Sequence, residues 1–283
     1  MILLADSGST KTDWRLIINE NEVIKVETNG INPFFLTKEE IFAEIRQNLM
    51  PEIVNYQPKA IYFYGAGCAN PEKNEIVRLA IAENFNTDNI KVDSDLVGAT
   101  LGLCSNKAGI VCILGTGSNS CFYDGQKIVE NVSPLGFIIG DEGSGAVLGR
   151  LFLGDCLKNQ LTEGIKDKFL KEYNLTVSEI LDKVYKQPTP NRFLASVVPF
   201  IKENIENKSI YNIVYKTFMD FFNKNVKFYN YKNHKVYFTG SVAYHFQDIL
   251  KTTANELNIN IGAIVKSPME GLIERLKVSS LKF

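Results

Sequence analysis

The stretch ILLADSGSTKTDWRLII, residues 2–18, decides the fold predicted for this chain. An apolar run at residues 2–5 has the character of a buried strand, a Gly/Ser/Thr turn follows at residues 6–12, and a second apolar run occupies residues 14–18. Residues 22–28 form a third run that is rich in Val and Ile. The amino-terminal region is therefore predicted to open with three antiparallel strands joined by short turns.

The spacing of the apolar residues changes beyond residue 30, from strand to helix periodicity. Strands are predicted at residues 60–64 and 90–92, and helices at residues 37–50, 71–84 and 96–104. The first of these helices has a capping box and apolar residues four apart, formed by Thr37, Glu40, Ile41, Ile45 and Leu49. An antiparallel meander followed by alternating strands and helices predicts a mixed α/β layer.

The strand pattern starts again at Gly109. A strand is predicted at residues 110–114, and a Gly/Thr/Ser turn follows at residues 115–119. Two further strands are predicted at residues 120–123 and 127–132. Aligning DSGS at residue 6 with GTGS at residue 115 matches Gly8 with Gly117 and Ser9 with Ser118, at a shift of 109 residues. The chain is therefore predicted to contain two similar domains, each opening with a hairpin whose turn exposes backbone N–H groups.

The rest of the chain is predicted to be mostly helical. Helical spacing runs from residue 143 to about residue 231. Two strands are then predicted at residues 235–239 and 260–264, each followed by a helix, at residues 242–257 and 268–277. The longest helical stretch, residues 210–228, carries lysines and aromatic residues, which could form a nucleic-acid patch or belong to a buried amphipathic helix. The buried helix is favoured, because one face would carry Val214, Thr217, Phe218, Phe221 and Phe228.

The composition limits the class of protein. Its 283 residues suggest about two domains, and 31 basic against 32 acidic residues leave a formal charge of −1. That balance argues against binding nucleic acid or an anionic membrane through bulk charge. No run approaches the ~18 apolar residues of a membrane span, and the amino terminus turns polar at Asp6, too early for a signal peptide. Five scattered cysteines without a CxxC pair are typical of reduced thiols, so a cytoplasmic protein is expected.

Two Gly/Ser/Thr turns are candidate phosphate sites. In the first, backbone N–H groups and the hydroxyls of Ser9, Thr10 and Thr12 can converge on an anion, while Asp6 can hold Mg²⁺ through water. Residues 115–119 form the second turn. Each alone could be a plain hairpin turn, but two turns at matching places favour a cleft that holds a polyphosphate from both sides. Neither is a Walker loop, because GxxxxGK[ST] does not occur.

Three further segments could carry chemistry or be ordinary helix starts. Asp93 and Asp95 lie between a strand and a helix, where one could cap the helix and Asp95 could be a general base. The glycine-rich segment 140–145 places acidic residues before a helix, which suits the helix dipole and also permits close approach of a ligand. Residues 239–242 join a strand to a helix through Gly240, where a nucleotide base or ribose could lie against the backbone.

Taken in order, these segments resemble the family of N-acetylglucosamine kinases and BadF/BadG/BcrA/BcrD-type ATPases, in the actin, hexokinase and Hsp70 superfamily. The resemblance spans the whole chain. It covers a first phosphate motif at residues 6–12 and a second at residues 114–119. It also covers an adenosine motif at residues 239–242 and the family-specific GDEGSG segment at residues 140–145. Pro268 and Gly271 lie in what looks like the closing helix that returns to the first domain.

The resemblance implies an α/β fold of two RNase H-like domains, with mixed five-stranded sheets and an ATP cleft between the domains. One domain would comprise residues 1–108 and 266–283, and the other residues 109–265. The implied reaction is attack of an amino-sugar 6-hydroxyl on the γ-phosphate of ATP, with Mg²⁺ as a further cofactor. A homodimer is also implied, and neither nucleic acid nor a membrane is an expected partner.

The same resemblance assigns roles to individual residues. Asp95 matches the catalytic base, and Asp6 matches the magnesium ligand. The sugar would be bound by Asn32, Gly117, Ser118, Asn119 and Asp141. The phosphates of ATP would be bound by Ser7, Gly8, Ser9, Thr10, Lys11, Thr12, Gly115 and Thr116, and the adenosine by Gly240 and Ser241.

The resemblance leaves the sugar open. N-acetylglucosamine kinases often have Trp-Gly ahead of GDEG, whereas this chain has Leu-Gly-Phe at residues 135–137. A reshaped wall there would suit a 3-O-substituted sugar, so N-acetylmuramic acid is the alternative to N-acetylglucosamine.

Two other activities are alternatives to a kinase. One is an ATPase that activates a dehydratase or reductase and carries a cysteine-held iron–sulfur cluster; cysteines inside apolar elements disfavour it. The other is a non-catalytic sugar or nucleotide sensor, which would have no need of a base such as Asp95.

Overall fold

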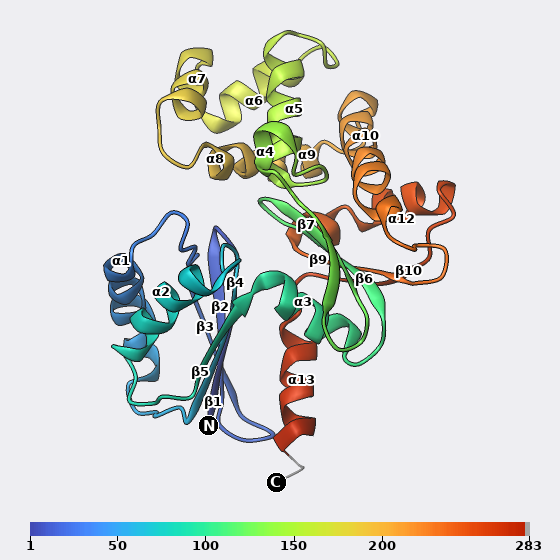
Figure 1. Cartoon of the computed structure of the whole chain (residues 1–283). Coiled ribbons are helices and arrows are strands. Elements are labelled where there is room, and N and C mark those ends of the chain that lie inside the picture. Colours follow the sequence, from blue (N-terminus) through green and yellow to red (C-terminus); the bar gives the residue numbers. More distant parts are fainter. Residues whose placement is uncertain (281–283) are drawn as a thin grey trace. The chain divides into compact units, whose positions relative to one another are not determined.

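The chain folds into two compact units, each built around one five-stranded sheet (Figure 1). The structure is a computed structural model, and it describes residues 1–280. Unit 1 comprises Met1–Lys107 together with the carboxyl-terminal segment that begins at Ser267, and unit 2 comprises Ala108–Lys266.

The sheet of unit 1 has the strand order β3-β2-β1-β4-β5. The strands are β1 (Ile2–Ser7), β2 (Lys11–Ile17), β3 (Val23–Asn29), β4 (Ala60–Gly65) and β5 (Ile90–Ser94). The first three pair antiparallel, while β4 runs parallel to β1 and β5 parallel to β4. The predicted antiparallel opening followed by strand–helix alternation is therefore confirmed.

Helices cover both faces of this sheet, as Figure 1 shows. On β1, Leu3 and Ala5 point to one face and Leu4 to the other, because successive side chains of a strand alternate. The first face packs against α1 (Lys38–Glu44) and α2 (Pro71–Ala82). The second packs against the two helices α3 (Asp95–Cys104) and α13 (Met269–Ser280).

The predicted helix over residues 37–50 is shorter than expected. Its capping box between Thr37 and Glu40 is present, but α1 ends at Glu44 and the chain continues as a π-helical turn, Ile45–Leu49, and a 3-10 turn, Met50–Ile53. A proline at position 51 accounts for the change, since it has no amide hydrogen and clashes with a continuing helix. The wider turn still keeps the predicted apolar residues Ile41, Ile45 and Leu49 buried.

Two glycines allow α3 and α13 to cross with their backbones in close approach. A Cβ at Gly271 would overlap the carbonyl oxygen of Gly102, and a Cβ at Gly102 would press on the carbonyl oxygen of Pro268. Any larger residue at either glycine would push the helices apart, because the clashing atoms belong to backbone that cannot rotate away.

Gly271→Ala is expected to lower the free energy of unfolding by about 1–3 kcal/mol, because the added methyl group overpacks this crossing. Thermal unfolding monitored by circular dichroism measures the change. Gly154→Ala is the matched control, because this helical glycine of unit 2 has open space around it and alanine is the better helix former. Equal or higher stability of Gly271→Ala than wild type would contradict the close crossing.

The sheet of unit 2 repeats the topology of unit 1. Its order is β10-β9-β6-β7-β8, with strands β6 (Gly109–Leu114), β7 (Ser118–Tyr123), β8 (Ile128–Val132), β9 (Val236–Thr239) and β10 (Ile261–Val265). Here too the first three strands pair antiparallel and the last two run parallel to the first. The predicted internal repeat is confirmed.

The repeat differs in detail from the alignment of Gly8 with Gly117. Ser7 pairs with Thr12 at the end of the first hairpin, whereas Leu114 pairs with Ser118 at the end of the second. The second turn is therefore one residue shorter than the first. Ser118 and Asn119, which the sequence predicts in the turn, lie on β7 instead. The strand ends thus match at a shift of 107 residues (114 minus 7) instead of 109.

The helices of unit 2 enclose one large hydrophobic core. They are α4 (Gly136–Ile139), α5 (Gly145–Leu157), α6 (Ile165–Tyr173), α7 (Val177–Tyr185), α8 (Pro190–Ser196), α9 (Val198–Glu203), α10 (Lys208–Lys224), α11 (Ser241–His245) and α12 (Gln247–Glu256). The prediction of a single helix at residues 242–257 is wrong: the chain leaves helical geometry at Phe246, which is buried in the core, and α11 and α12 lie on either side of it.

Helix α10 has the buried face that was predicted, with Val214, Thr217, Phe218 and Phe221 inside. The nucleic-acid interpretation of its aromatic residues is therefore wrong for these positions. Phe228 differs from the prediction, since it follows the helix and is 67% exposed. Across residues 1–280, no helix combines the length and apolar character needed to cross a membrane.

Candidate active site

The first candidate phosphate turn has a rigid backbone. The amide of Gly8 donates to the carbonyl of Lys11 at 2.9 Å, and the amide of Gly30 donates to the carbonyl of Thr10 at 3.0 Å. A Cβ at Gly30 would overlap the carbonyl oxygen of Gly8, so only glycine lets the following segment brace the turn this closely. Gly8, Thr10 and Lys11 are exposed and Ser9 is half-buried, which leaves their side of the turn accessible to an anion.

Ser7 and Thr12 hold together the two strand ends that flank the turn. Both are fully buried, and their hydroxyl oxygens lie 2.7 Å apart. The Thr12 hydroxyl also donates to the carbonyl of Asn29 at 3.1 Å, while the Ser7 hydroxyl lies 3.0 Å from the carbonyl of Ile31. These two predicted phosphate-binding residues therefore lie in the scaffold of the hairpin, whereas the residues between them form its surface.

Asn32 lies beside the first turn with its side-chain amide held in place. Its Nδ2 donates to the Ser9 hydroxyl at 3.2 Å, and its Oδ1 accepts from the amide of Phe34 at 3.0 Å. The residue is only 5% exposed. Because this side-chain amide is held in place, it is a suitable group for orienting a hydroxyl-rich ligand.

Asp6 lies near the carboxyl end of β1, directly opposite Tyr64 on β4. The Ser267 hydroxyl donates to its Oδ2 at 3.0 Å. Burial raises the pKa of the Asp6 carboxyl to about 7; the Ser267 bond opposes this shift, and the negative charge of Asp95 adds to it. Because burial and the charge of Asp95 disfavour the ionised form of Asp6, a cation bound nearby would stabilise that form.

Asp95 is the first residue of α3, immediately after β5. The cap of this helix is Ser94, whose hydroxyl accepts from the Val97 amide at 3.3 Å, so the prediction that Asp93 or Asp95 caps it is wrong. The Oδ1 of Asp95 accepts from the Leu96 amide at 2.8 Å. Burial raises the pKa of the Asp95 carboxyl to about 6, and the backbone hydrogen bonds limit the shift. A pKa near neutrality suits a general base.

The two carboxylates belong to one edge of the unit 1 sheet. Strands β1, β4 and β5 are parallel, and their carboxyl ends meet at the same edge, where Asp6 and Asp95 lie. Asp13, opposite Asp6 on β2, is already neutralised by Arg15 through contacts of 2.8 and 3.1 Å. Asp13, Arg15, Gly30 and Ser267 were not predicted; only Ser267 carried a signal, as a Ser-Pro pair before a helix.

The donor set at this edge fits Mg²⁺ rather than a transition metal. Within residues 1–280, no group of three His, Cys, Asp or Glu residues is arranged to hold a metal ion. Magnesium does not need such a group, because it is commonly held by one or two carboxylates together with phosphate oxygens and water. Asp6, with one hydrogen-bonded oxygen and a raised pKa, is a carboxylate of the kind that such an ion uses.

In unit 2, the second turn is attached to the start of α5. The Gly115 amide donates to the Gly117 carbonyl at 2.9 Å, which closes the turn. The amides of Gly145 and Ala146 donate to the carbonyls of Gly115 and Thr116, at 2.8 and 3.0 Å. The first amides of α5 are therefore used to hold the turn, and the glycine-rich segment before this helix lies against it.

Asp141 joins that segment to the turn. It adopts the left-handed conformation with φ of 53°, and its amide donates to the Pro134 carbonyl at 2.7 Å. Its Oδ1 accepts from the Ser118 amide at 3.3 Å, while a Cβ at Gly117 would be 3.1 Å from its Oδ2. Burial raises the pKa of the Asp141 carboxyl to about 6.

Gly240 completes this cluster at the junction of β9 and α11. Its φ is 110°, and a Cβ there would overlap the carbonyl oxygen of Leu114, next to the second turn. Ser241 is the exposed first residue of α11. Asn119 is held on β7, where its Oδ1 accepts from the Ser120 amide at 2.9 Å and from Asn131 Nδ2 at 3.0 Å. Unit 2 thus brings together the predicted residues of three separate segments.

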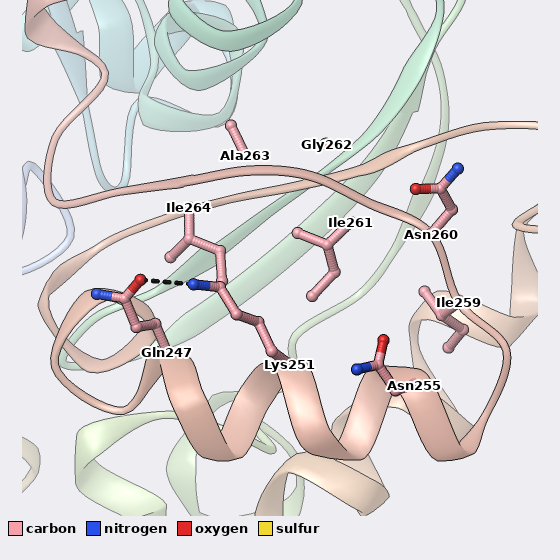
Figure 2. A pocket seen from close by; sticks show the side chains of 9 residues that line it. All are labelled: Gln247, Lys251, Asn255, Ile259, Asn260, Ile261, Gly262, Ala263 and Ile264. Carbon is pink, nitrogen blue, oxygen red and sulfur yellow. Dashed lines mark hydrogen bonds between the residues drawn. The ribbon is translucent and has the colours of Figure 1, made fainter.

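A groove of about 490 Å³ lies elsewhere in unit 2, between α12 and the edge strand β10. Figure 2 shows its lining, where Lys251 Nζ donates to Gln247 Oε1 at 2.9 Å. None of the predicted site residues lines this groove.

Solved structures with similar folds come from several bacteria. A candidate N-acetylglucosamine kinase from Porphyromonas gingivalis has 44% sequence identity and a TM-score of 0.94, over 99% of this chain and 100% of that one. A candidate N-acetylglucosamine kinase from Chromobacterium violaceum has 15% identity and a TM-score of 0.75, over 97% and 98%. MreB 5 of Spiroplasma citri, bound to AMPPNP, has 10% identity and a TM-score of 0.59, over 99% and 96%.

These likenesses, with the two five-stranded sheets, confirm the predicted α/β fold, which the chain shares with MreB 5. No protein-family model matches the chain, and no curated protein matches it.

Proposed function

This chain belongs to the family of the candidate N-acetylglucosamine kinase from Porphyromonas gingivalis, and we propose that it phosphorylates the 6-hydroxyl of an N-acetylated amino sugar with ATP. N-acetylglucosamine is the first candidate substrate. The observation that carries the proposal is the pair of half-buried carboxylates, Asp6 and Asp95, at one edge of the unit 1 sheet. Phosphoryl transfer needs little beyond a base, Mg²⁺ and positioned donors, and this pair would supply the base and a ligand for Mg²⁺.

In the proposed reaction, Asp95 accepts the proton of the sugar 6-hydroxyl as that oxygen forms a bond to the γ-phosphorus. The bond between the γ-phosphorus and the β–γ bridging oxygen breaks, and ADP leaves. Asp6 would hold Mg²⁺, directly or through water, and the ion would neutralise charge on the phosphate oxygens. The proton on Asp95 then passes to solvent, which regenerates the base.

The remaining predicted residues would bind the two substrates. The exposed parts of the two turns, Gly8–Lys11 and Gly115–Thr116, would contact phosphate oxygens. The backbone donors would be amides other than those of Gly8 and Gly115, which close the turns themselves. Asn32, Ser118, Asn119 and Asp141, with the backbone of Gly117, would hold sugar hydroxyls, and their anchored geometry supports this role because it reduces the cost of ordering them on binding. Gly240 and Ser241 would contact the adenosine.

N-acetylmuramic acid is the second candidate substrate, because the segment before Asp141 is open enough to leave room for a substituent. The Asp141 amide is held by Pro134, next to Leu135, whose side chain is 60% exposed. Ile138 and Ile139 of the same segment are also exposed, at 70% and 73%. A sugar substituent larger than a hydroxyl could rest on this open apolar segment.

A partner-activating ATPase is disfavoured by the cysteines. All five are buried: Cys68, Cys104, Cys112, Cys121 and Cys156. A cluster shared between two subunits needs thiolates at a surface, and burial raises the pKa of the Cys68, Cys104 and Cys156 thiols to about 12, 12 and 11.

Release of ADP from Mg-ATP is expected to rise strongly with one N-acetylated sugar and to stay at background without sugar. A coupled assay measures it in separate reactions with N-acetylglucosamine, N-acetylmuramic acid, N-acetylmannosamine, glucosamine or glucose. The preferred sugar identifies the substrate, and a 6-phosphate product identified by NMR establishes the acceptor. Equal ADP release with and without sugar would contradict the kinase and favour an ATPase. The homodimer and the cytoplasmic location stay predictions.

A further inference from the structure

Ser267 connects the candidate magnesium ligand to the last helix of the chain. Its hydroxyl oxygen lies 3.0 Å from Oδ2 of Asp6 and 3.2 Å from the amide nitrogen of Met269. An ionised carboxylate can only accept a hydrogen bond and a backbone amide can only donate one. When Asp6 is ionised, as it is when it binds a metal ion, the Ser267 hydroxyl therefore donates to Asp6 and accepts from Met269, so its orientation is fixed at both ends.

The backbone that carries Ser267 is also fixed. The next residue, Pro268, packs its carbonyl oxygen against Gly102 of α3, at the close crossing of α3 and α13. Met269 and Leu272 are 1% and 2% exposed and anchor the first turn of α13 in the unit 1 core. Since Ser267 has little freedom to move, its bond restrains the Asp6 carboxylate rather than following it.

This bond is the only hydrogen bond to the Asp6 side chain among residues 1–280, and it engages one oxygen. The other nearby carboxylates do not take up the Ser267 hydroxyl: Asp13 is held by Arg15, and Asp95 by the amide of Leu96. Oδ1 of Asp6 therefore has its position set by a restraint on Oδ2, while remaining available to a ligand.

We propose that Ser267 is a positioning residue for magnesium: by holding Oδ2 of Asp6, it fixes the carboxylate so that Oδ1 faces the metal–nucleotide complex. The inference rests on the proposed function, because it takes Asp6 as the magnesium ligand. Hydrogen-bonding partners of metal ligands commonly contribute about 10–100-fold to metal affinity. Ser267 is not a catalytic residue in this proposal, since it contacts neither substrate.

The test measures Mn²⁺ binding in the presence of AMPPNP, by the electron paramagnetic resonance signal of free Mn²⁺. Ser267→Ala is expected to weaken Mn²⁺ binding about tenfold, because the carboxylate loses its restraint. Ser267→Thr, which retains the hydroxyl, is expected to bind Mn²⁺ within about twofold of wild type. Ser267→Val has the shape of threonine without the hydroxyl and is expected to resemble Ser267→Ala. In turnover assays of Ser267→Ala and Ser267→Val, the half-saturating Mg²⁺ concentration should rise while the KM for sugar stays unchanged.

The matched control is Thr37→Ala, which removes a helix-capping hydroxyl in the same unit at α1, away from Asp6. It should bind Mn²⁺ like wild type, which separates loss of a cap from loss of positioning. The Thr and Val variants keep the test interpretable if Ser267→Ala does not fold, because they differ only in the hydroxyl.

Equal Mn²⁺ affinity of the Thr and Val variants would overturn the inference. Asp6→Asn distinguishes the two levels of the argument. If Asp6→Asn loses Mn²⁺ and Ser267→Val does not, only the role of Ser267 is wrong. If Asp6→Asn also binds Mn²⁺ like wild type, Asp6 is not the magnesium ligand, and that part of the proposed function fails together with the inference.

Discussion

Asp95→Asn is expected to lower kcat by about 10²–10⁴-fold while AMPPNP and the sugar still bind. The asparagine Oδ1 can accept the Leu96 amide bond that Asp95 accepts now, at 2.8 Å, so the start of α3 should be preserved. What is lost is the ability to take a proton from the sugar hydroxyl. Steady-state kinetics together with calorimetric binding of AMPPNP and sugar separates the chemical step from binding.

The pH dependence of the wild type provides a second readout of the same residue. Because burial raises the pKa of Asp95 to about 6, kcat/KM should increase with pH below about 6 and level off above it, as the base becomes ionised. Asp93→Asn is the matched control; this carboxylate pairs with Lys91 at 3.2 Å and has no place in the proposed reaction. Wild-type kcat in Asp95→Asn would remove Asp95 as the base.

Asp6→Asn is expected to lower kcat/KM at least about 100-fold and, in the nucleotide-free protein, to raise stability at pH 8. The loss of activity follows from loss of the magnesium ligand. The gain of stability follows from burial, which raises the pKa of Asp6 from its usual 3.8 to about 7. The stabilising contribution of such a group is fully present below about pH 4 and is lost as the pH rises through about 7.

Between pH 5 and pH 8 the size of that effect is about 1–3 kcal/mol, taking about 1.4 kcal/mol for each of the roughly two pH units of the shift in this range and allowing for solvent at a half-buried group. Asparagine stays neutral, so the variant should lose less stability than wild type between pH 5 and pH 8. Thermal unfolding at both pH values measures the difference, with Asp93→Asn as the control. Adding Mg²⁺ and AMPPNP should raise the wild-type midpoint at pH 8 more than that of the variant, because only the wild type carries the metal ligand. A lower midpoint for Asp6→Asn in the nucleotide-free protein at pH 8 would contradict the raised pKa.

The strands, their order of appearance and the repeat could be predicted because their signals are local. Residues 2–18 alternate apolar runs with a glycine-rich turn, and residues 109–132 do so again, so the two hairpins follow from spacing alone. Local signals also predicted the capping box of α1 and the buried face of α10. They failed at Phe246, which is buried in the core and leaves helical geometry between α11 and α12.

Motifs in the sequence alone determined the candidate chemistry of this protein: two glycine-rich turns, the aspartates at positions 6 and 95, and the GDEGSG segment. Only the tertiary structure decided which of those groups face a ligand and which form the scaffold. It turns the Ser7 and Thr12 hydroxyls inward, and it brings Ser267 to Asp6 across 261 residues of sequence. The physical reason is that a turn glycine acts through its own backbone, whereas the direction of a hydroxyl or carboxylate depends on a partner that distant packing supplies.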